Sequence, residues 1–326
     1  MKNIKFLKYT AAALVISTLF INCNNESIDK DNPSIPYPAI GGYENSDAIA
    51  SGNLVSKFSF ENALTDKMAA ITNAQPTNVA YVAGVKGNAY QGSSSQMRYF
   101  VGDANASITG LNSFTIAFWM NSAGTVDPAV AGQGKGAQGI FSIVRPTEFW
   151  GGINLFLENP DGAFPDRIRL KIDLENGRPG VAWGSQGAIM NIDNAKNKWI
   201  HVVYTYDAKT STLSAYKDGE PAANLGNFPY APAGGVQGSA KLFADNPGGL
   251  DNPNNAAGYG DFLMKGTNGK VLFGNHQFQT TPPLNNGGPQ GWATSYAGML
   301  DEFRIYNIAL PSADVAALYK LEKDGR

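Results

Sequence analysis

The sequence is poor in the residues on which many kinds of chemistry depend. Its 326 residues include one cysteine and two histidines, and only 16% of them are charged, with a net charge of −2. A single cysteine excludes disulfide bonds within the chain, and two histidines leave no histidine cluster for a metal centre. The small net charge gives no electrostatic reason to expect nucleic acid or an anionic membrane surface as a partner.

The first 22 residues have the layout of a secretory signal. Lys2, Lys5 and Lys8 precede an apolar stretch, AAALVISTLFIN, which is too short to span a membrane as a mature helix. Cys23 follows directly, as in a bacterial lipobox, where the cysteine thiol is lipidated. We therefore predict a signal peptide over residues 1–22 and an outer-membrane lipoprotein that is anchored at Cys23 and exposed at the cell surface.

The next segment is polar and lacks a regular hydrophobic period. It carries three prolines and no sustained period of 2 or 3.6, so we predict a flexible tether over residues 23–50. Its acidic residues Glu26, Asp29 and Asp31 resemble the export signals of surface lipoproteins in the Bacteroides group. A tether behind a lipidated cysteine would let a domain stand away from the membrane.

From residue 51 onward the sequence indicates short strands separated by turns. The stretch RIRLKIDLE is the clearest, because Ile168, Leu170, Ile172 and Leu174 alternate with charged residues. Such alternation marks an antiparallel strand with one face in the core and one in water. No helical period longer than three turns appears after the signal. Many short strands without helices favour a sandwich or a barrel.

Four stretches together carry a resemblance to a known family. They are FSFENALTD, SFTIAFWM, NKWIHVVYTYDAKTSTLSAYKDGE and GMLDEFRIYNIALPSADVAALY, in that order. Their order and spacing, over about residues 52–321, resemble a laminin-G-like domain of the concanavalin A-like jelly-roll type. The resemblance implies an all-β fold in which two antiparallel sheets pack face to face, with a short C-terminal helix. We expect this domain to occupy residues 51–326.

The paired carboxylates of the chain do not form the acid and base of an enzyme in this interpretation. Asp301 and Glu302 are adjacent on a strand, so they point to opposite faces unless a bulge intervenes. Asp173 and Glu175 share one face, about 6.6 Å apart, but three basic side chains share it too, which favours a solvated, salt-bridged surface. Glucanases with this fold draw their carboxylates from E-x-D-x-x-E, a string that is absent here.

The resemblance also implies a calcium ion. Relatives often bind one near the first and last strands, and Asp66 and Asp301 occupy the matching motif positions. Calcium takes 6–8 oxygen ligands, which two carboxylates, carbonyl groups and water would supply. Turn-forming and strand-capping roles for the same two residues stay open as the alternative.

Aromatic residues in expanded loops are the candidates for ligand binding. The connections near 121–139, 224–262 and 275–297 are long for this fold, and long loops are usually functional or disordered. The loop aromatics that we select are Trp150, Tyr230, Tyr259, Trp292 and Tyr296. Sugar rings stack on aromatic rings, and amides such as those of Asn285 and Gln290 bind hydroxyl groups. The alternative is that these aromatic residues pin the loops to the sandwich.

These observations predict a surface-anchored, non-catalytic module that captures a glycan or polysaccharide, beside an outer-membrane uptake complex. Its contact with the membrane would be through the lipid anchor only. A protein-binding adhesion module of the same fold is the alternative. A glycoside hydrolase or lyase is the least favoured function.

Overall fold

The computed structural model describes residues 37–126, 136–182, 184–225, 237–245 and 255–326. The folded unit runs from Ala39 to Arg326. Cys23 and Tyr230 lie outside the described residues. Among the residues that are described, no helix is long and apolar enough to cross a membrane.

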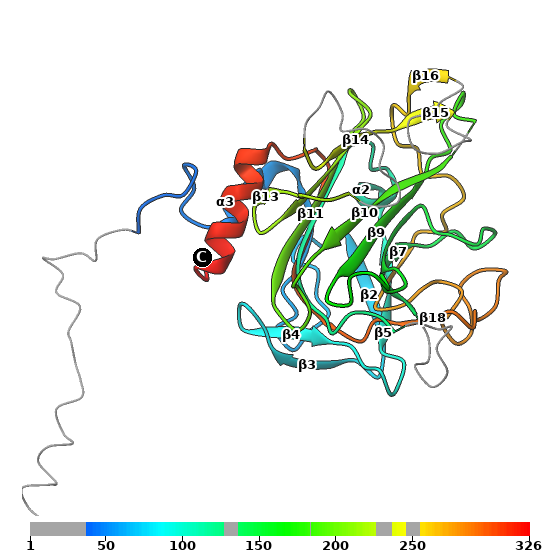
Figure 1. The fold of residues 1–326 in the computed structure, drawn as a ribbon, viewed down its shortest axis with the longest axis horizontal. Coiled ribbons are helices and arrows are strands. Elements are labelled where there is room, and N and C mark those ends of the chain that lie inside the picture. The colour runs from blue at the N-terminus through cyan, green and yellow to red at the C-terminus, as the bar shows by residue number, and fades with distance from the viewer. Residues whose placement is uncertain (1–36, 127–135, 183, 226–236, 246–254) are drawn as a thin grey trace, which may run out of the picture. The chain divides into compact units, whose positions relative to one another are not determined.

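Two β-sheets form the body of the folded unit (Figure 1). The nine-stranded sheet has the order β13-β12-β11-β6-β19-β4-β3, with β1 on β19 and β14 on β12. Its strands are β1 (Leu54–Phe58), β3 (Ala80–Ala83), β4 (Asn88–Gln91), β6 (Phe114–Asn121), β11 (Ile200–Asp207), β12 (Thr212–Lys217), β13 (Glu220–Pro221), β14 (Ser239–Lys241) and β19 (Met299–Tyr306).

The eight-stranded sheet has the order β10-β9-β8-β7-β17-β5-β2. Its strands are β2 (Ile71–Thr77), β5 (Tyr99–Ala104), β7 (Ala137–Ile143), β8 (Ile153–Leu157), β9 (Ile168–Glu175), β10 (Ser185–Ile192), β17 (Lys270–Phe273) and β18 (Ala293–Ser295). Pairing is antiparallel throughout, except that β18 runs parallel to β7. A small third sheet pairs β15 (Phe243–Asp245) with β16 (Asn255–Gly258).

The main core lies between the two sheets and follows the alternation of the sequence. Ile168, Leu170, Ile172 and Leu174 of β9 all point into it and are at most 2% exposed. They meet inward residues of β6 and β11 in the facing sheet, such as Phe118. The expected all-β, two-sheet jelly-roll sandwich with a short C-terminal helix is therefore confirmed.

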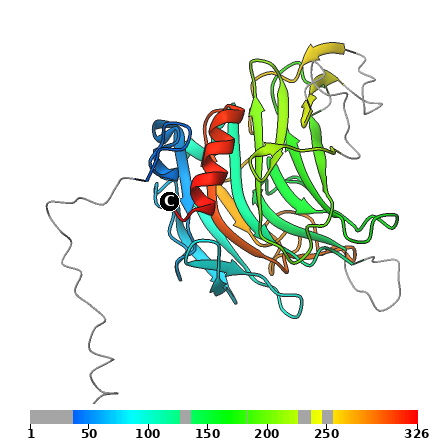
Figure 2. The same ribbon diagram turned by 60° about the vertical axis from the view of Figure 1, so that its left-hand side comes forward.

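A second apolar layer covers the outer face of the nine-stranded sheet. Helix α3 (Ser312–Lys323) lies there beside the segment that begins at Ala39, drawn red and blue in Figure 2. Val315, Leu318 and Leu321 of the helix pack with Ile49. The remaining short helices are η1 (Ser46–Ala48), η2 (Ser51–Asn53) and α2 (Ala106–Thr109).

The segment 39–50 is part of this fold, although the sequence predicted it as tether. Ile49 is fully buried, and Asp47 contacts Lys57 Nζ at 2.5 Å and Arg304 Nη1 at 2.6 Å. Ser46 Oγ donates a hydrogen bond to the carbonyl oxygen of Arg326. The segment is polar because it pairs with buried charges of the sheet. Such pairing leaves no hydrophobic period in the sequence, so the pattern resembles that of a tether.

Candidate functional site

Three large aromatic side chains gather on the outer face of the eight-stranded sheet. Phe149 and Trp150 follow β7, whereas Trp292 comes from the long connection after β17. The ring centroids of Trp150 and Trp292 are 6.1 Å apart, and that of Phe149 lies 5.1 Å from Trp150. Phe149 is 38% exposed and both tryptophans are half-buried. We call these three residues the aromatic patch.

Buried rings beneath the patch fix its shape. Phe149 stacks on Phe278 at 4.4 Å, and Trp150 stacks on Phe156, an outward-facing residue of β8, at 5.2 Å. His276 lies between these layers and stacks on Phe278 at 4.9 Å. Burial lowers the pKa of His276 to about 3, so its ring is neutral at physiological pH. The patch is therefore the exposed top of a larger packed aromatic cluster.

Amide side chains tie the two loops of the patch together. Gln277 Nε2 donates hydrogen bonds to the carbonyl oxygens of Glu148 at 2.8 Å and Phe149 at 3.0 Å. Asn285 Nδ2 donates to the same two carbonyl groups, and Gln290 Nε2 donates to Gly288. These amide nitrogens hold the loop backbone, and binding of ligand hydroxyls by Asn285 and Gln290 stays a prediction.

The structure separates the aromatic residues that the sequence placed in one class. Trp150 and Trp292 come together in the patch, although 141 residues lie between them. Tyr296 is fully buried, with its hydroxyl donating to backbone carbonyls of the neighbouring strands. Tyr259 is also fully buried, and its hydroxyl donates to the carbonyl oxygen of Leu174. Neither tyrosine can present its ring to a ligand, so both pin their loops to the sandwich.

Phe149 is the patch residue that the sequence reasoning missed. It stands next to Trp150 in the stretch TEFWGG, and this adjacency was the only available signal. Its importance depends on the stack with Phe278, which lies 129 positions further along the chain. No local pattern encodes that contact.

The outer face of β9 is less solvated than its sequence suggests. Asp173 is only 4% exposed and accepts a hydrogen bond from Ser185 Oγ at 3.3 Å. Burial, together with the neighbouring carboxylate of Glu175, raises the pKa of Asp173 to about 7. Glu175 pairs with Arg145 at 3.5 Å, and Lys171 pairs with Glu158. The face is salt-bridged as expected, but Asp173 is shielded from water by its neighbours.

Asp301 and Glu302 sit at a β-bulge in β19, where the register to β6 shifts between Asp301 and Arg304. Glu302 has a positive φ of 45°, which accommodates the extra residue. Both carboxylates are buried and serve different partners. Asp301 accepts the backbone N–H groups of Val85 and Glu302, each at 2.8 Å. Glu302 pairs with two buried cations of the sheet, Arg304 at 2.9 Å and Lys57 at 3.0 Å. This arrangement supports a structural role for the pair.

Asp66 serves the backbone in the same way. Its carboxylate accepts the N–H groups of Lys57, Met68 and Ile71 at 2.8–3.0 Å. Within the described part of the chain, no three His, Cys, Asp or Glu side chains are grouped as metal ligands would be. These contacts fit the strand-capping alternative, and calcium at Asp66 and Asp301 stays a prediction.

Comparison with known proteins agrees with this architecture. The family model of the concanavalin A-like lectin/glucanases superfamily, of the laminin-G type, matches residues 99–257. The chain contains a laminin-G-like domain. The structure extends this domain on both sides of the matched residues, to the whole of the two-sheet sandwich. No curated protein matches the chain in sequence.

Solved structures share the fold of the laminin-G-like domain at low identity. The binding domain of Paraclostridial Mosquitocidal Protein 1 has a TM-score of 0.50 and 16% identity, over 82% of this chain and 52% of that one. The binding domain of botulinum neurotoxin DC was solved in complex with rat synaptotagmin II and with SialylT. It has a TM-score of 0.50 and 14% identity, over 84% of this chain and 52% of that one. The chain thus spans about half the length of these structures, and identities this low show the fold alone.

Proposed function

We propose that the domain is a non-catalytic binding module at the cell surface that captures a glycan on the aromatic patch. One observation carries the proposal: Phe149, Trp150 and Trp292 are assembled at the surface from two distant loops and are partly open to solvent. Exposed aromatic rings are an unfavourable use of surface unless a ligand covers them. The apolar C–H faces of sugar rings stack on such rings.

The fold neighbours support a binding role. Each of those solved structures is a binding domain by its own description, and the neurotoxin domain was solved with rat synaptotagmin II and with SialylT. A lipid on Cys23 would hold the module on the outer membrane, where it would deliver polysaccharide to an uptake complex. Protein recognition by the same patch is the alternative. The glycan array and the pull-down described below separate glycan capture from protein recognition.

The test compares Phe149→Ala with a matched control, Phe164→Ala. Phe149 is 38% exposed and lies in the patch, whereas Phe164 is 50% exposed and lies elsewhere on the surface. We expect the Phe149 variant to bind polysaccharide about tenfold more weakly in a titration, since an aromatic contact contributes up to about 1.5 kcal/mol. The control variant should bind like the wild type, and both should keep the wild-type melting temperature within a few degrees.

The polysaccharides are chosen from an array of xylans, mannans, dextrans and mucin glycans, screened beside a pull-down from envelope extract. Equal binding by wild type and Phe149→Ala would place glycan recognition outside the patch. Capture of one envelope protein, lost in Phe149→Ala and without any glycan signal, would replace glycan capture by the adhesion function.

A further inference from the structure

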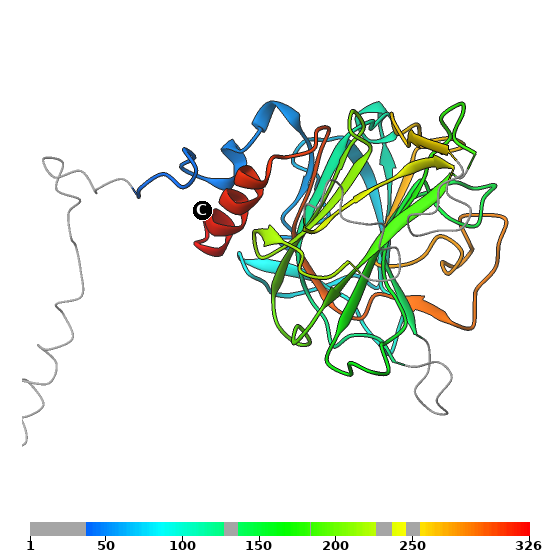
Figure 3. The same ribbon diagram turned by 45° about the horizontal axis from the view of Figure 1, so that its top comes forward.

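A polar groove lies on the opposite side of the sandwich from the aromatic patch. The long connection after β17 (orange) and helix α3 (red) lie on opposite sides in Figures 1 and 3. The groove has a volume of about 390 Å³ and runs over the outer face of β11, β12 and β14. Ala309, Leu310 and Pro311, which precede α3, form its other wall.

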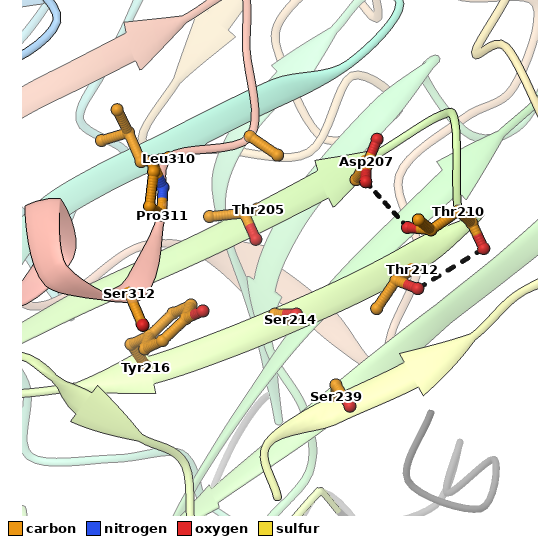
Figure 4. A pocket seen from close by; sticks show the side chains of 11 residues that line it. Thr205, Asp207, Thr210, Thr212, Ser214, Tyr216, Ser239, Leu310, Pro311 and Ser312 are labelled. Carbon is orange, nitrogen blue, oxygen red and sulfur yellow. Dashed lines mark hydrogen bonds between the residues drawn. The ribbon is translucent and has the colours of Figure 1, made fainter. Parts of the chain in front are cut away.

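Hydroxyl groups dominate the lining of this groove (Figure 4). Thr205 and Ser214 are paired across β11 and β12, and Ser239 of β14 is paired with Ser214, so three hydroxyl residues form one row across the sheet. Tyr216 stands at one end of the groove, and Asp207 at the other. Among the described residues that line the groove, Asp207 is the one acidic residue.

The walls of the groove are fixed before any ligand arrives. Thr115 Oγ1 donates to the carbonyl oxygen of Ile308 at 2.7 Å and accepts the N–H of Leu310 at 2.8 Å. Asp207 accepts the N–H of Lys209 and the hydroxyl of Thr210, which holds the turn between β11 and β12. A groove that is already ordered loses little entropy on binding, which favours affinity for a small ligand.

One hydroxyl in the floor has unused hydrogen-bonding capacity. Thr205 is 4% exposed, and its hydroxyl makes no hydrogen bond to any residue that the structure describes. Because this hydroxyl lines an open groove, it can donate to and accept from a ligand hydroxyl without breaking an internal hydrogen bond. Thr205 lies at one end of the row of hydroxyl residues, beside Ser214.

We propose that this groove binds a neutral sugar residue, as a second site that is independent of the aromatic patch. Serine, threonine and tyrosine hydroxyls donate and accept, so they match sugar hydroxyls of either orientation. The carboxylate of Asp207 accepts hydrogen bonds from sugar hydroxyls but repels anions, and no lysine or arginine is among the described residues that line the groove. Tyr216 and Pro311 supply apolar surface for the C–H groups of the ring.

The test uses two substitutions that spare the fold. Thr205→Val removes a hydroxyl that has no partner, so no internal hydrogen bond is lost. Asp207→Asn keeps an acceptor for the N–H of Lys209 and removes the charge. Thr72→Val, an exposed threonine of β2 in the other sheet, is the matched control. The probes are neutral hexasaccharides of glucose, mannose and xylose, with a hyaluronan hexasaccharide as the anionic probe.

Calorimetric titrations are run on the full chain carrying Phe149→Ala, which weakens binding at the aromatic patch about tenfold. We expect at least one neutral probe to bind, about fivefold more weakly with Thr205→Val and about tenfold more weakly with Asp207→Asn. Thr72→Val should change nothing. Absence of binding by every neutral probe, preference for hyaluronan, or unchanged affinity in both groove variants would overturn the second site. None of these outcomes bears on glycan capture at the patch, which is measured with the groove intact.

Discussion

Asp173 offers the sharpest test of whether the buried carboxylates are structural or catalytic. It is 4% exposed, faces Glu175 and has a pKa of about 7. A carboxyl group held near neutral pH beside a second carboxylate is also what a glycosidase uses as its general acid. We predict a structural role, in which ionisation of Asp173 costs stability because the charge is shielded from water.

The magnitude follows from the pKa. Each pKa unit is worth about 1.4 kcal/mol, so ionising Asp173 in the folded state costs up to about 4 kcal/mol at alkaline pH. Because the pKa of Asp173 is raised in the folded state, its protonated form stabilises the fold. That stabilisation is fully present below the unfolded pKa of about 3.9 and is lost as pH rises through 7. Asp173→Asn stays neutral at every pH. Its stability relative to the wild type should therefore rise by about 2–3 kcal/mol between pH 5 and pH 8.

Urea unfolding at pH 5 and pH 8 measures this difference. Asp166→Asn is the matched control, since it makes the same substitution at an exposed aspartate. An Asp173→Asn effect that is equal at both pH values would refute the buried-charge reasoning. Release of new reducing ends from polysaccharide by the wild type, abolished in Asp173→Asn, would make Asp173 catalytic and refute the binding-only function.

Three further predictions concern the anchor, the metal and the N-terminal segment. Cys23→Ala should release the protein from the membrane fraction or leave the precursor unprocessed, and membrane retention at the mature size would contradict the lipid anchor. If calcium binds at Asp66 and Asp301, chelation should lower the melting temperature, since a ligand of the native state stabilises it; an unchanged melt and no calcium by elemental analysis would reject the ion. Asp47→Ala should lower the free energy of unfolding by about 1–3 kcal/mol, because it bridges two buried cations from a half-exposed position; an unchanged urea midpoint at pH 7 would contradict this.

The pH dependence of the Asp47 contribution has a defined sign. Partial burial raises the pKa of Asp47, but Lys57 and Arg304 outweigh it and hold the pKa below its ordinary value. A lowered folded pKa means that the contribution is present above pH 4 and is lost on acidification. The stability difference between Asp47→Ala and the wild type should therefore shrink in acid, in the opposite sense to that of Asp173→Asn.

The fold could be predicted from the sequence because its signals are local and repeated. The alternation in β9 fixes which side chains face the core, and its four apolar residues are buried as that pattern requires. The sequence did not predict that the folded domain begins at Ala39, before residue 51. The attachment of segment 39–50 depends on Arg304 and Arg326, which are more than 250 positions away along the chain.

The candidate site was only partly predictable for a related reason. A loop tryptophan signals possible exposure, and both tryptophans of the patch were selected on that basis. Tyr259 and Tyr296 carry the same signal, yet their hydroxyls reach backbone acceptors that let the rings be fully buried. Whether such an acceptor exists depends on tertiary contacts. The groove was missed because its hydroxyl row joins three strands, and each strand alone shows only ordinary outward-facing residues.

The way the chain uses its carboxylates favours binding over catalysis. Asp66 and Asp301 accept backbone N–H groups, and Glu302 neutralises buried cations of the sheet. Glu322 of α3 is buried against Arg304, with Nε and Oε1 2.6 Å apart. A retaining glycosidase needs two carboxyl groups about 5–5.5 Å apart on one cleft wall, open to substrate. The aromatic patch presents aromatic rings and the groove presents hydroxyl groups, with Asp207 as the one carboxylate among the described residues that line the groove. Rings and hydroxyl groups of this kind suit the contact and hydrogen bonding that the proposed binding function requires.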